Sequence, residues 1–139
     1  MLKKEFSAET LVRAAVDALK KSYAPYSGFN VGAAIICSDG EIITGCNIEN
    51  ASYPVTVCAE RVALYKAVSE GRKKFMAASV VGGINGIITD FCAPCGMCRQ
   101  AFTEFCSPDF LFYLYDGSKF KSFTLGELMP ESFNGGLLK

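Results

Sequence analysis

The sequence predicts a three-layer α/β/α sandwich in which helices cover both faces of one mixed five-stranded sheet. Segments with strand and helix patterns alternate along the 139 residues, and such alternation is typical of a layered α/β domain. An early pair of strands joined by a tight turn makes part of that sheet antiparallel. The length fits a single domain spanning residues 1–139.

Capping and turn residues delimit the predicted elements. Ser7 can cap the first helix, whose apolar residues recur every three or four positions. The turn Asp39-Gly40 predicts a hairpin, Gly71 a helix end, and Pro94 a helix start. In order, the elements are a helix over 7–22, strands over 29–37 and 41–46, a loop over 47–53, a helix over 57–70, a strand over 75–83, a helix over 95–105, strands over 110–115 and 120–123, and a last helical turn capped by Thr124.

Composition excludes several kinds of chemistry. The chain contains no histidine, which removes Ser-His and Cys-His nucleophile pairs, His-ligated metals and the usual general base near neutral pH. The 14 basic and 14 acidic residues give a net charge of zero, so no basic surface is expected for a nucleic-acid backbone. Chemistry must therefore rest on carboxylates, on the seven cysteines or on a cofactor.

The sequence predicts a cytoplasmic protein that does not enter a membrane. The amino-terminal residues 1–6 carry charge and precede no apolar stretch, unlike an export signal. The longest apolar runs, such as 31–37, are far shorter than a membrane span. In a reducing compartment an odd number of cysteines is better explained by metal ligands and core thiols than by disulfides.

Cysteines gather at the starts of two predicted helices. Cys58-Ala59-Glu60 opens one helix, and Cys95 and Cys98, which share a face, open another. Helix N-termini stabilise thiolates. If the two helices meet start to start, they bring three sulfurs and one carboxylate around a single point. Three thiolates fill three corners of a tetrahedral zinc site and leave the fourth for water, as in catalytic sites.

The cysteine spacing alone leaves two arrangements open. A fourth thiol from Cys92, Cys37, Cys46 or Cys106 would close the coordination sphere and make the site structural. Small buried thiols are also common in protein cores, and we expect Cys37, Cys46 and Cys106 to be of that kind.

Several strings, in order along most of the chain, resemble the small cytidine deaminases of free nucleosides. They are Tyr23-Ala24-Pro25-Tyr26-Ser27, Phe29 with Val31-Gly32-Ala33-Ala34, Asn47-Ile48-Glu49-Asn50-Ala51-Ser52-Tyr53, Cys58-Ala59-Glu60-Arg61, Pro94-Cys95-Gly96-Met97-Cys98-Arg99-Gln100, and Met129-Pro130 with Phe133. The resemblance implies a cytidine deaminase-like fold, and the all-cysteine zinc site resembles the homotetrameric branch of the family.

The activity implied by this resemblance is zinc-dependent hydrolysis of free cytidine and deoxycytidine to uridine and deoxyuridine, with release of ammonia, in pyrimidine salvage. Cys58, Cys95 and Cys98 would hold one zinc ion per subunit, and Cys92 would be a bystander. Glu60 would take a proton from the attacking water, pass it to ring N3, and then protonate the leaving amino group.

The resemblance also implies a set of substrate contacts. Asn47 and Glu49 would hold the ribose hydroxyls, and the Ala59 amide would donate to the base carbonyl. Phe29 would pack on the pyrimidine, whereas Tyr53 and Phe133 would reach the site from neighbouring subunits of a homotetramer. From the residues alone, core packing is the simpler explanation for the three aromatics, as turn chemistry is for the asparagine.

Arg61 is expected to support the metal site from outside. Three thiolates give a zinc centre a net charge of minus one, which weakens its pull on water. Arg61 lies three residues after Cys58 on the predicted helix, so its guanidinium can donate a hydrogen bond to that sulfur. The two helix N-termini add partial positive charge.

Other functions compete with this interpretation. One is a non-catalytic zinc-binding module, and another is a deaminase of a cytosine-containing antibiotic such as blasticidin S, which shares the Cys-x-Glu and Pro-Cys-x-x-Cys patterns. A thioredoxin-like redox role for Cys95 and Cys98 is a weaker alternative. Asn47, Glu49 and Phe133 favour ordinary nucleosides, and the neutral charge argues against a nucleic-acid-binding module.

Overall fold

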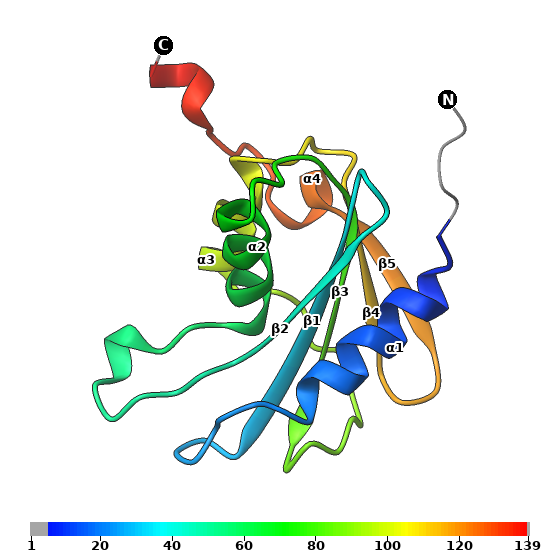
Figure 1. The fold of residues 1–139 in the computed structure, drawn as a ribbon, viewed down its shortest axis with the longest axis vertical. Coiled ribbons are helices and arrows are strands. Elements are labelled where there is room, and N and C mark those ends of the chain that lie inside the picture. The colour runs from blue at the N-terminus through cyan, green and yellow to red at the C-terminus, as the bar shows by residue number, and fades with distance from the viewer. Residues whose placement is uncertain (1–5, 139) are drawn as a thin grey trace.

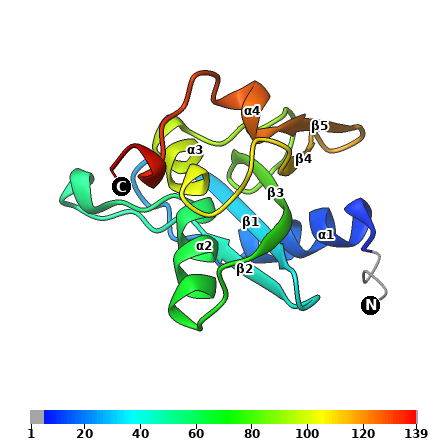
Figure 2. The same cartoon turned by 90° about the horizontal axis from the view of Figure 1, so that it is seen from above.

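The computed structural model describes residues 6–138, and it has the predicted three layers around a mixed sheet (Figures 1 and 2). The five strands are ordered β2-β1-β3-β4-β5. The elements are α1 (Ala8–Leu19), β1 (Phe29–Cys37), β2 (Ile42–Cys46), α2 (Ala59–Ser69), β3 (Phe75–Ile84), α3 (Gly96–Thr103), β4 (Leu111–Tyr115), β5 (Phe120–Thr124) and α4 (Leu125–Leu128), with short 3-10 turns η1 (Tyr53–Val55) and η2 (Gly135–Leu138).

The strand pairing confirms that the sheet is mixed. β1 pairs antiparallel with both β2 and β3, and β5 pairs antiparallel with β4. Only β3 and β4 run parallel, and the chain between them includes α3, because a parallel pair needs a crossover rather than a hairpin.

Two 3-10 turns, η1 and η2, were not predicted from the sequence.

On one face of the sheet, α1 packs directly onto β1. Ser7 caps the helix by accepting a hydrogen bond from the Thr10 amide, as predicted. Gly32 allows the helix to come close, because a Cβ there would lie 2.0 Å from the Ala15 carbonyl oxygen and 2.5 Å from the Leu19 nitrogen. The buried residues of this layer are Leu11, Val12, Ala15, Leu19, Ala34, Ile36, Ala77 and Val81.

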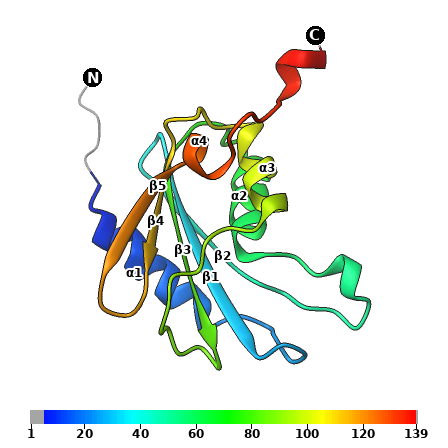
Figure 3. The same cartoon turned by 180° about the vertical axis from the view of Figure 1, so that it is seen from behind.

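The opposite face carries α2, α3 and α4 (Figure 3). Phe102 of α3 packs against Phe110 and Phe112, with ring centroids 5.6 and 5.0 Å away. Gly45 of β2 allows α2 to pack close to the sheet, as Gly32 does for α1. A Cβ on Gly45 would lie 2.6 Å from the Ala59 carbonyl oxygen. This layer therefore fixes α2 and α3 against the same side of the sheet.

Three predicted helix boundaries differ from the structure. The first helix ends at Leu19 rather than at Ser22, because the next residues continue in tighter turns in which each amide bonds the carbonyl three residues back. Cys58 and Cys95, expected within the first turns of their helices, are the N-cap residues of α2 and α3 and have extended backbone. Both thiols therefore stand just before the helix starts.

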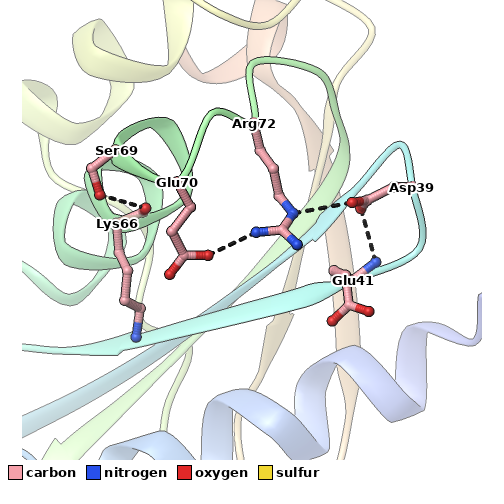
Figure 4. Close-up of polar contacts among 6 residues, drawn as sticks. All are labelled: Asp39, Glu41, Lys66, Ser69, Glu70 and Arg72. Carbon is pink, nitrogen blue, oxygen red and sulfur yellow. Dashed lines mark hydrogen bonds and ion pairs between the residues drawn. The ribbon is translucent and has the colours of Figure 1, made fainter.

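An arginine ties the end of α2 to the β1–β2 turn (Figure 4). Gly71 adopts a φ of +92° after the helix, as expected for a terminating glycine. The next residue, Arg72, forms ion pairs of 3.1 Å with Asp39 and 2.7 Å with Glu70. This arginine joins the end of the helix to the hairpin turn, at the opposite end of α2 from Cys58.

None of the helices within residues 6–138 has the length and apolar character needed to cross a bilayer. The charged residues 1–5, on which the absence of an export signal was partly argued, lie outside the described part of the chain.

Gly32→Ala should destabilise the fold by about 2–3 kcal/mol, because the added methyl group meets backbone atoms that cannot move independently of α1. Gly96→Ala is the matched control, since a Cβ there has no neighbour within 4 Å, and it should change stability by less than about 0.5 kcal/mol. Urea unfolding of the zinc-loaded proteins, followed by circular dichroism, measures both. Equal urea midpoints for the two variants would contradict the close-approach argument.

Candidate functional site

Three cysteine sulfurs meet where α2 and α3 begin. The Cys95 sulfur lies 3.5 Å from that of Cys58 and 3.4 Å from that of Cys98. Cys58 and Cys95 are the N-caps of their helices, and Cys98 lies in the first turn of α3. The three sulfurs all lie within 4.8 Å of one another. Packing of both helices on one sheet face therefore brings together residues that are 37 positions apart in the chain.

This cluster has dimensions that suit zinc. A tetrahedral zinc ion with bonds of about 2.3 Å to sulfur separates neighbouring sulfurs by about 3.8 Å, close to the distances between these thiols. Within residues 6–138 no other group of three potential ligands comes together in this way. Cys58 is half-buried, Cys95 is exposed and Cys98 is buried, so the cluster opens to solvent on the Cys95 side.

The remaining cysteines lie outside the cluster. Burial raises the pKa of Cys37 to about 11 and that of Cys106 to about 12, and it also raises the pKa of Cys46. Burial thus favours the protonated thiol at these three positions, as is usual for cysteines in a protein core.

Arg61 donates a hydrogen bond to the Cys58 sulfur over 3.6 Å, which is the contact expected from the helix spacing. Hydrogen bonds from Cys98 and Arg61 lower the pKa of the Cys58 thiol to about 5, against the effect of its partial burial. The Arg61 Nε–H is buried and has no hydrogen-bond partner in the described chain. The guanidinium is thus held beside the sulfurs although its Nε–H lacks an acceptor in the described chain, and a buried donor without an acceptor lowers the stability of the fold.

Glu60 is buried next to this cluster. It is the second residue of α2, and only 4% of it is exposed. Burial raises the pKa of its carboxyl group, and the negative charge of Cys58 raises it further. A carboxyl group with a raised pKa exchanges a proton more readily near neutral pH than an exposed one. Ala59, just before it, is fully buried, and its amide belongs to the first turn of α2, where N–H groups lack helical partners.

Phe29 lies on the same side of the sheet as the cluster. A Cβ on Gly82 would come within 2.9 Å of the Phe29 ring and 3.0 Å of the Cys92 sulfur, so both groups lie over this glycine. Burial raises the pKa of Cys92 to about 12, and the charges of Glu60 and Cys58 add to the effect. Phe29 and Cys92 therefore border the space beside Glu60.

Asn47 is buried and mostly occupied by hydrogen bonds within the protein. Its side-chain oxygen accepts from the Val31 amide at 2.9 Å and from the Ser22 hydroxyl, and its NH₂ group donates to the Phe29 carbonyl at 2.8 Å. Among residues 6–138, only one of its two amide hydrogens has an acceptor, which leaves the other for a further partner. Asn47 thus fixes the start of β1, where Phe29 lies.

Glu49 lines a separate, open hollow of about 370 Å³ with Tyr26, Ser27, Tyr53 and Thr56. Its carboxylate accepts hydrogen bonds from the amides of Tyr26 and Ser27 at 2.9 and 3.1 Å and from the Ser27 hydroxyl. The bonds from Ser27 and Tyr26 hold the pKa of Glu49 below its usual range. Tyr26 and Ser27 were not chosen as site residues from the sequence, although they belong to the string 23–27 that carries part of the resemblance.

Two predicted site residues point into solvent. Tyr53 is 70% exposed and touches Tyr26 edge to face, with centroids 5.8 Å apart. Phe133 is 60% exposed and lies in the C-terminal segment that passes α3 and leaves the body of the fold (Figure 3). Neither ring is packed in the core of the single chain, which removes the alternative of simple core packing for both.

Comparisons with known proteins agree on one family. The model of the "Cytidine and deoxycytidylate deaminase zinc-binding region" matches residues 6–114. A cytidine deaminase from Halalkalibacterium halodurans is 44% identical over 126 residues, covering 90% of this chain and 92% of the relative. One from Sporosarcina psychrophila is 42% identical over 127 residues, covering 91% of this chain and 90% of the relative.

A solved structure is also similar. The crystal structure of a cytidine deaminase from Burkholderia pseudomallei superposes with a TM-score of 0.84 at 40% identity, covering 92% of this chain and all of that one. A more distant relative is a blasticidin-S deaminase from Bacillus cereus, which is 37% identical over 105 residues, or 73% of this chain and 74% of the relative.

Arg61→Ala should weaken zinc binding by about tenfold, because it removes the positive charge and the donor beside the Cys58 sulfur. Competition with a chromogenic zinc chelator measures the affinity. Arg13→Ala is the control, since Arg13 is an exposed residue of α1 that pairs with Glu9. If both variants hold zinc as tightly as the unaltered protein, the arginine does not support the site.

Proposed function

The chain belongs to the cytidine deaminase family and is an enzyme that hydrolytically deaminates cytidine, and from this premise we propose that Glu60 carries the protons of the reaction beside a zinc ion held by Cys58, Cys95 and Cys98. The observation that carries the proposal is the meeting of three sulfurs next to a buried carboxyl group at the starts of two helices. We propose one zinc ion per subunit and a single domain over residues 1–139.

The mechanism follows from what each group can do. Cys58, Cys95 and Cys98 would hold the zinc ion, which would supply a Lewis acid that lowers the pKa of a water molecule, so that hydroxide forms near neutral pH. Glu60 takes a proton from that water and delivers it to ring N3 as the oxygen adds to C4 of the cytosine. Glu60 then takes the remaining proton of the attacking hydroxyl and transfers it to the amino group, which leaves as ammonia, so that the product is uridine. Its raised pKa suits one carboxyl group that accepts and then donates.

We propose substrate contacts at two places, the cysteine cluster and the hollow that Glu49 lines. Phe29 packs on the pyrimidine, and the Ala59 amide donates to the base carbonyl. The free amide hydrogen of Asn47 and the carboxylate of Glu49 hold the ribose hydroxyls. Hydrogen bonds within the protein already orient both side chains, so little freedom is lost when the sugar binds. We include deoxycytidine among the substrates.

The hollow beside Glu49 favours a nucleoside over a nucleotide. Its lining residues are Tyr26, Ser27, Glu49, Tyr53 and Thr56, which carry hydroxyl groups and one carboxylate and include no cationic side chain. A fixed carboxylate repels a phosphate group, whereas it accepts hydrogen bonds from a diol. This charge pattern supports free cytidine as the substrate. We also propose that the reaction belongs to pyrimidine salvage in the cytoplasm.

We propose that the active form is a homotetramer in which neighbouring subunits complete each site. The support is the exposure of Tyr53 and Phe133, at 70% and 60%. Large exposed aromatics are typical of interfaces, where burial stabilises them. In an assembly, these rings cover the open side of a neighbour's site and exclude water from the base.

A second candidate substrate is blasticidin S, because a deaminase of that antibiotic is 37% identical over most of the chain. The two substrates share the cytosine ring and differ in the sugar. Values of kcat/KM for cytidine and blasticidin S, measured side by side, decide between them. We expect cytidine to be favoured, because we propose that Asn47 and Glu49 hold the hydroxyl groups of a ribose.

Glu60→Gln should keep zinc and the fold but lower deamination by at least about 100-fold, because an amide cannot relay protons. The loss of absorbance as cytidine becomes uridine gives the rate, and metal analysis on the same sample gives the zinc content. A variant that retains zinc and turns over normally would show that another group moves the protons. Normal zinc content without activity in the unaltered protein would favour the non-catalytic zinc module.

Mixed oligomers test whether sites are shared. Phe133→Ala should raise KM, and Glu60→Gln should abolish turnover, each in every site of its own oligomer. When the two variants are co-expressed, some sites combine an intact Glu60 from one chain with an intact Phe133 from another. Activity at low cytidine should therefore exceed the average of the two variants. Activity equal to that average would mean that each site is built from one chain.

A further inference from the structure

The segment that leads into Cys95 is held by side chains rather than by backbone pairing. Between β3 and α3 the chain has no helix or strand, and within the described residues no backbone–backbone hydrogen bond outside regular elements involves residues 88–94. Phe91 packs against the core and lies under the Lys121 ammonium, 5.4 Å from its ring centroid. The position of a metal ligand thus depends on a few side-chain anchors.

Arg99 provides the anchor nearest to Cys95. Its Nε–H donates to the Pro94 carbonyl at 2.7 Å, and a terminal N–H donates to the Leu128 carbonyl at 2.8 Å. The Pro94 carbonyl is part of the planar peptide that joins Pro94 to Cys95. A hydrogen bond that fixes this carbonyl therefore also fixes the orientation of the backbone at Cys95. The planar guanidinium holds two carbonyls at a fixed separation, which the single ammonium group of a lysine does not.

The second carbonyl belongs to the C-terminal part of the chain. Leu128 is the last residue of α4, where carbonyls lack helical partners. The next residue on α3, Gln100, donates from its side chain to the Phe133 carbonyl at 3.1 Å. Arg99 and Gln100, two consecutive residues of the helix that carries Cys98, therefore hold the segment 128–133. This segment runs from α4 past α3 (Figures 1 and 3).

We propose that Arg99 is a positioning residue that fixes the Pro94–Cys95 peptide at the metal centre and ties it to the C-terminal segment that carries Phe133. The proposal rests on the zinc site of the proposed function. Within residues 6–138 the Arg99 side chain makes hydrogen bonds to the Pro94 and Leu128 carbonyls and none to a cysteine sulfur. It therefore acts through Cys95 and through Leu128. Within the described part of the chain, the only hydrogen bond of the Gln100 side chain goes to the same C-terminal segment, at the Phe133 carbonyl. Gln100 is therefore the natural comparison.

Arg99→Met and Gln100→Leu separate the two connections. Each variant removes hydrogen-bond donors while keeping a side chain of similar size. Two quantities are measured on the zinc-loaded protein without substrate: the rate of zinc release to a chromogenic chelator and the rate of chymotrypsin cleavage after Phe133. Arg99→Met should speed zinc release by about tenfold and should also speed cleavage. Gln100→Leu should speed cleavage and leave zinc release unchanged.

Other patterns overturn the proposal. Zinc release at the unaltered rate in Arg99→Met removes the positioning role, and equal acceleration in both variants shows a general loosening of α3. If Arg99→Met does not fold, Arg99→Lys is measured in its place; it keeps one donor and should release zinc at an intermediate rate, whereas the unaltered rate contradicts the proposal. Neither readout requires turnover, so an inactive protein that shows the expected pattern counts against the proposed function alone.

Discussion

Three cysteine sulfurs converge where α2 and α3 begin, and the rest of the site is arranged around them. Two are helix N-caps, so they stand in the partial positive field of the first-turn amides, which stabilises thiolates. The Cys95 sulfur lies 3.4 Å from the Cys98 sulfur and 3.5 Å from the Cys58 sulfur. Three deprotonated thiols at these distances would repel one another, and the zinc ion that we propose here would balance that charge.

The groups that we propose for proton transfer and charge compensation lie at the start of α2, next to Cys58. Glu60 follows Cys58 by two residues, and the packing of α2 on the sheet buries it. Burial beside a negatively charged sulfur raises its pKa, which is the property that a group needs if it is to accept and then donate a proton. Arg61, one residue further, places its positive charge on the Cys58 sulfur. One turn of helix thus carries all three groups that we propose for metal binding, for proton transfer and for charge compensation.

Several residues proposed for the site are already held by hydrogen bonds within the single chain. Asn47 fixes the start of β1, Glu49 fixes the turn that contains Tyr26 and Ser27, and Arg99 fixes the peptide before Cys95. Such prior ordering reduces the entropy lost on binding. The exceptions are the exposed rings of Tyr53 and Phe133, which the single chain leaves uncovered. This contrast between ordered interior groups and exposed aromatics underlies the proposal that neighbouring subunits complete each site.

The sequence by itself determined the mixed five-stranded sheet and the two cysteine-bearing helix starts, because hydrophobic periodicity, Asp39-Gly40, Gly71 and Pro94 are local signals. The tertiary structure decided which cysteines meet. Cys92 is three residues from Cys95 in the sequence yet lies outside the cluster, whereas Cys58, 37 residues away, belongs to it. It also decided that Glu60 is buried and that Arg99 bridges Pro94 to Leu128. These features depend on how α2, α3 and the C-terminal segment pack on one sheet face, and contacts between distant segments leave no periodic trace in the chain.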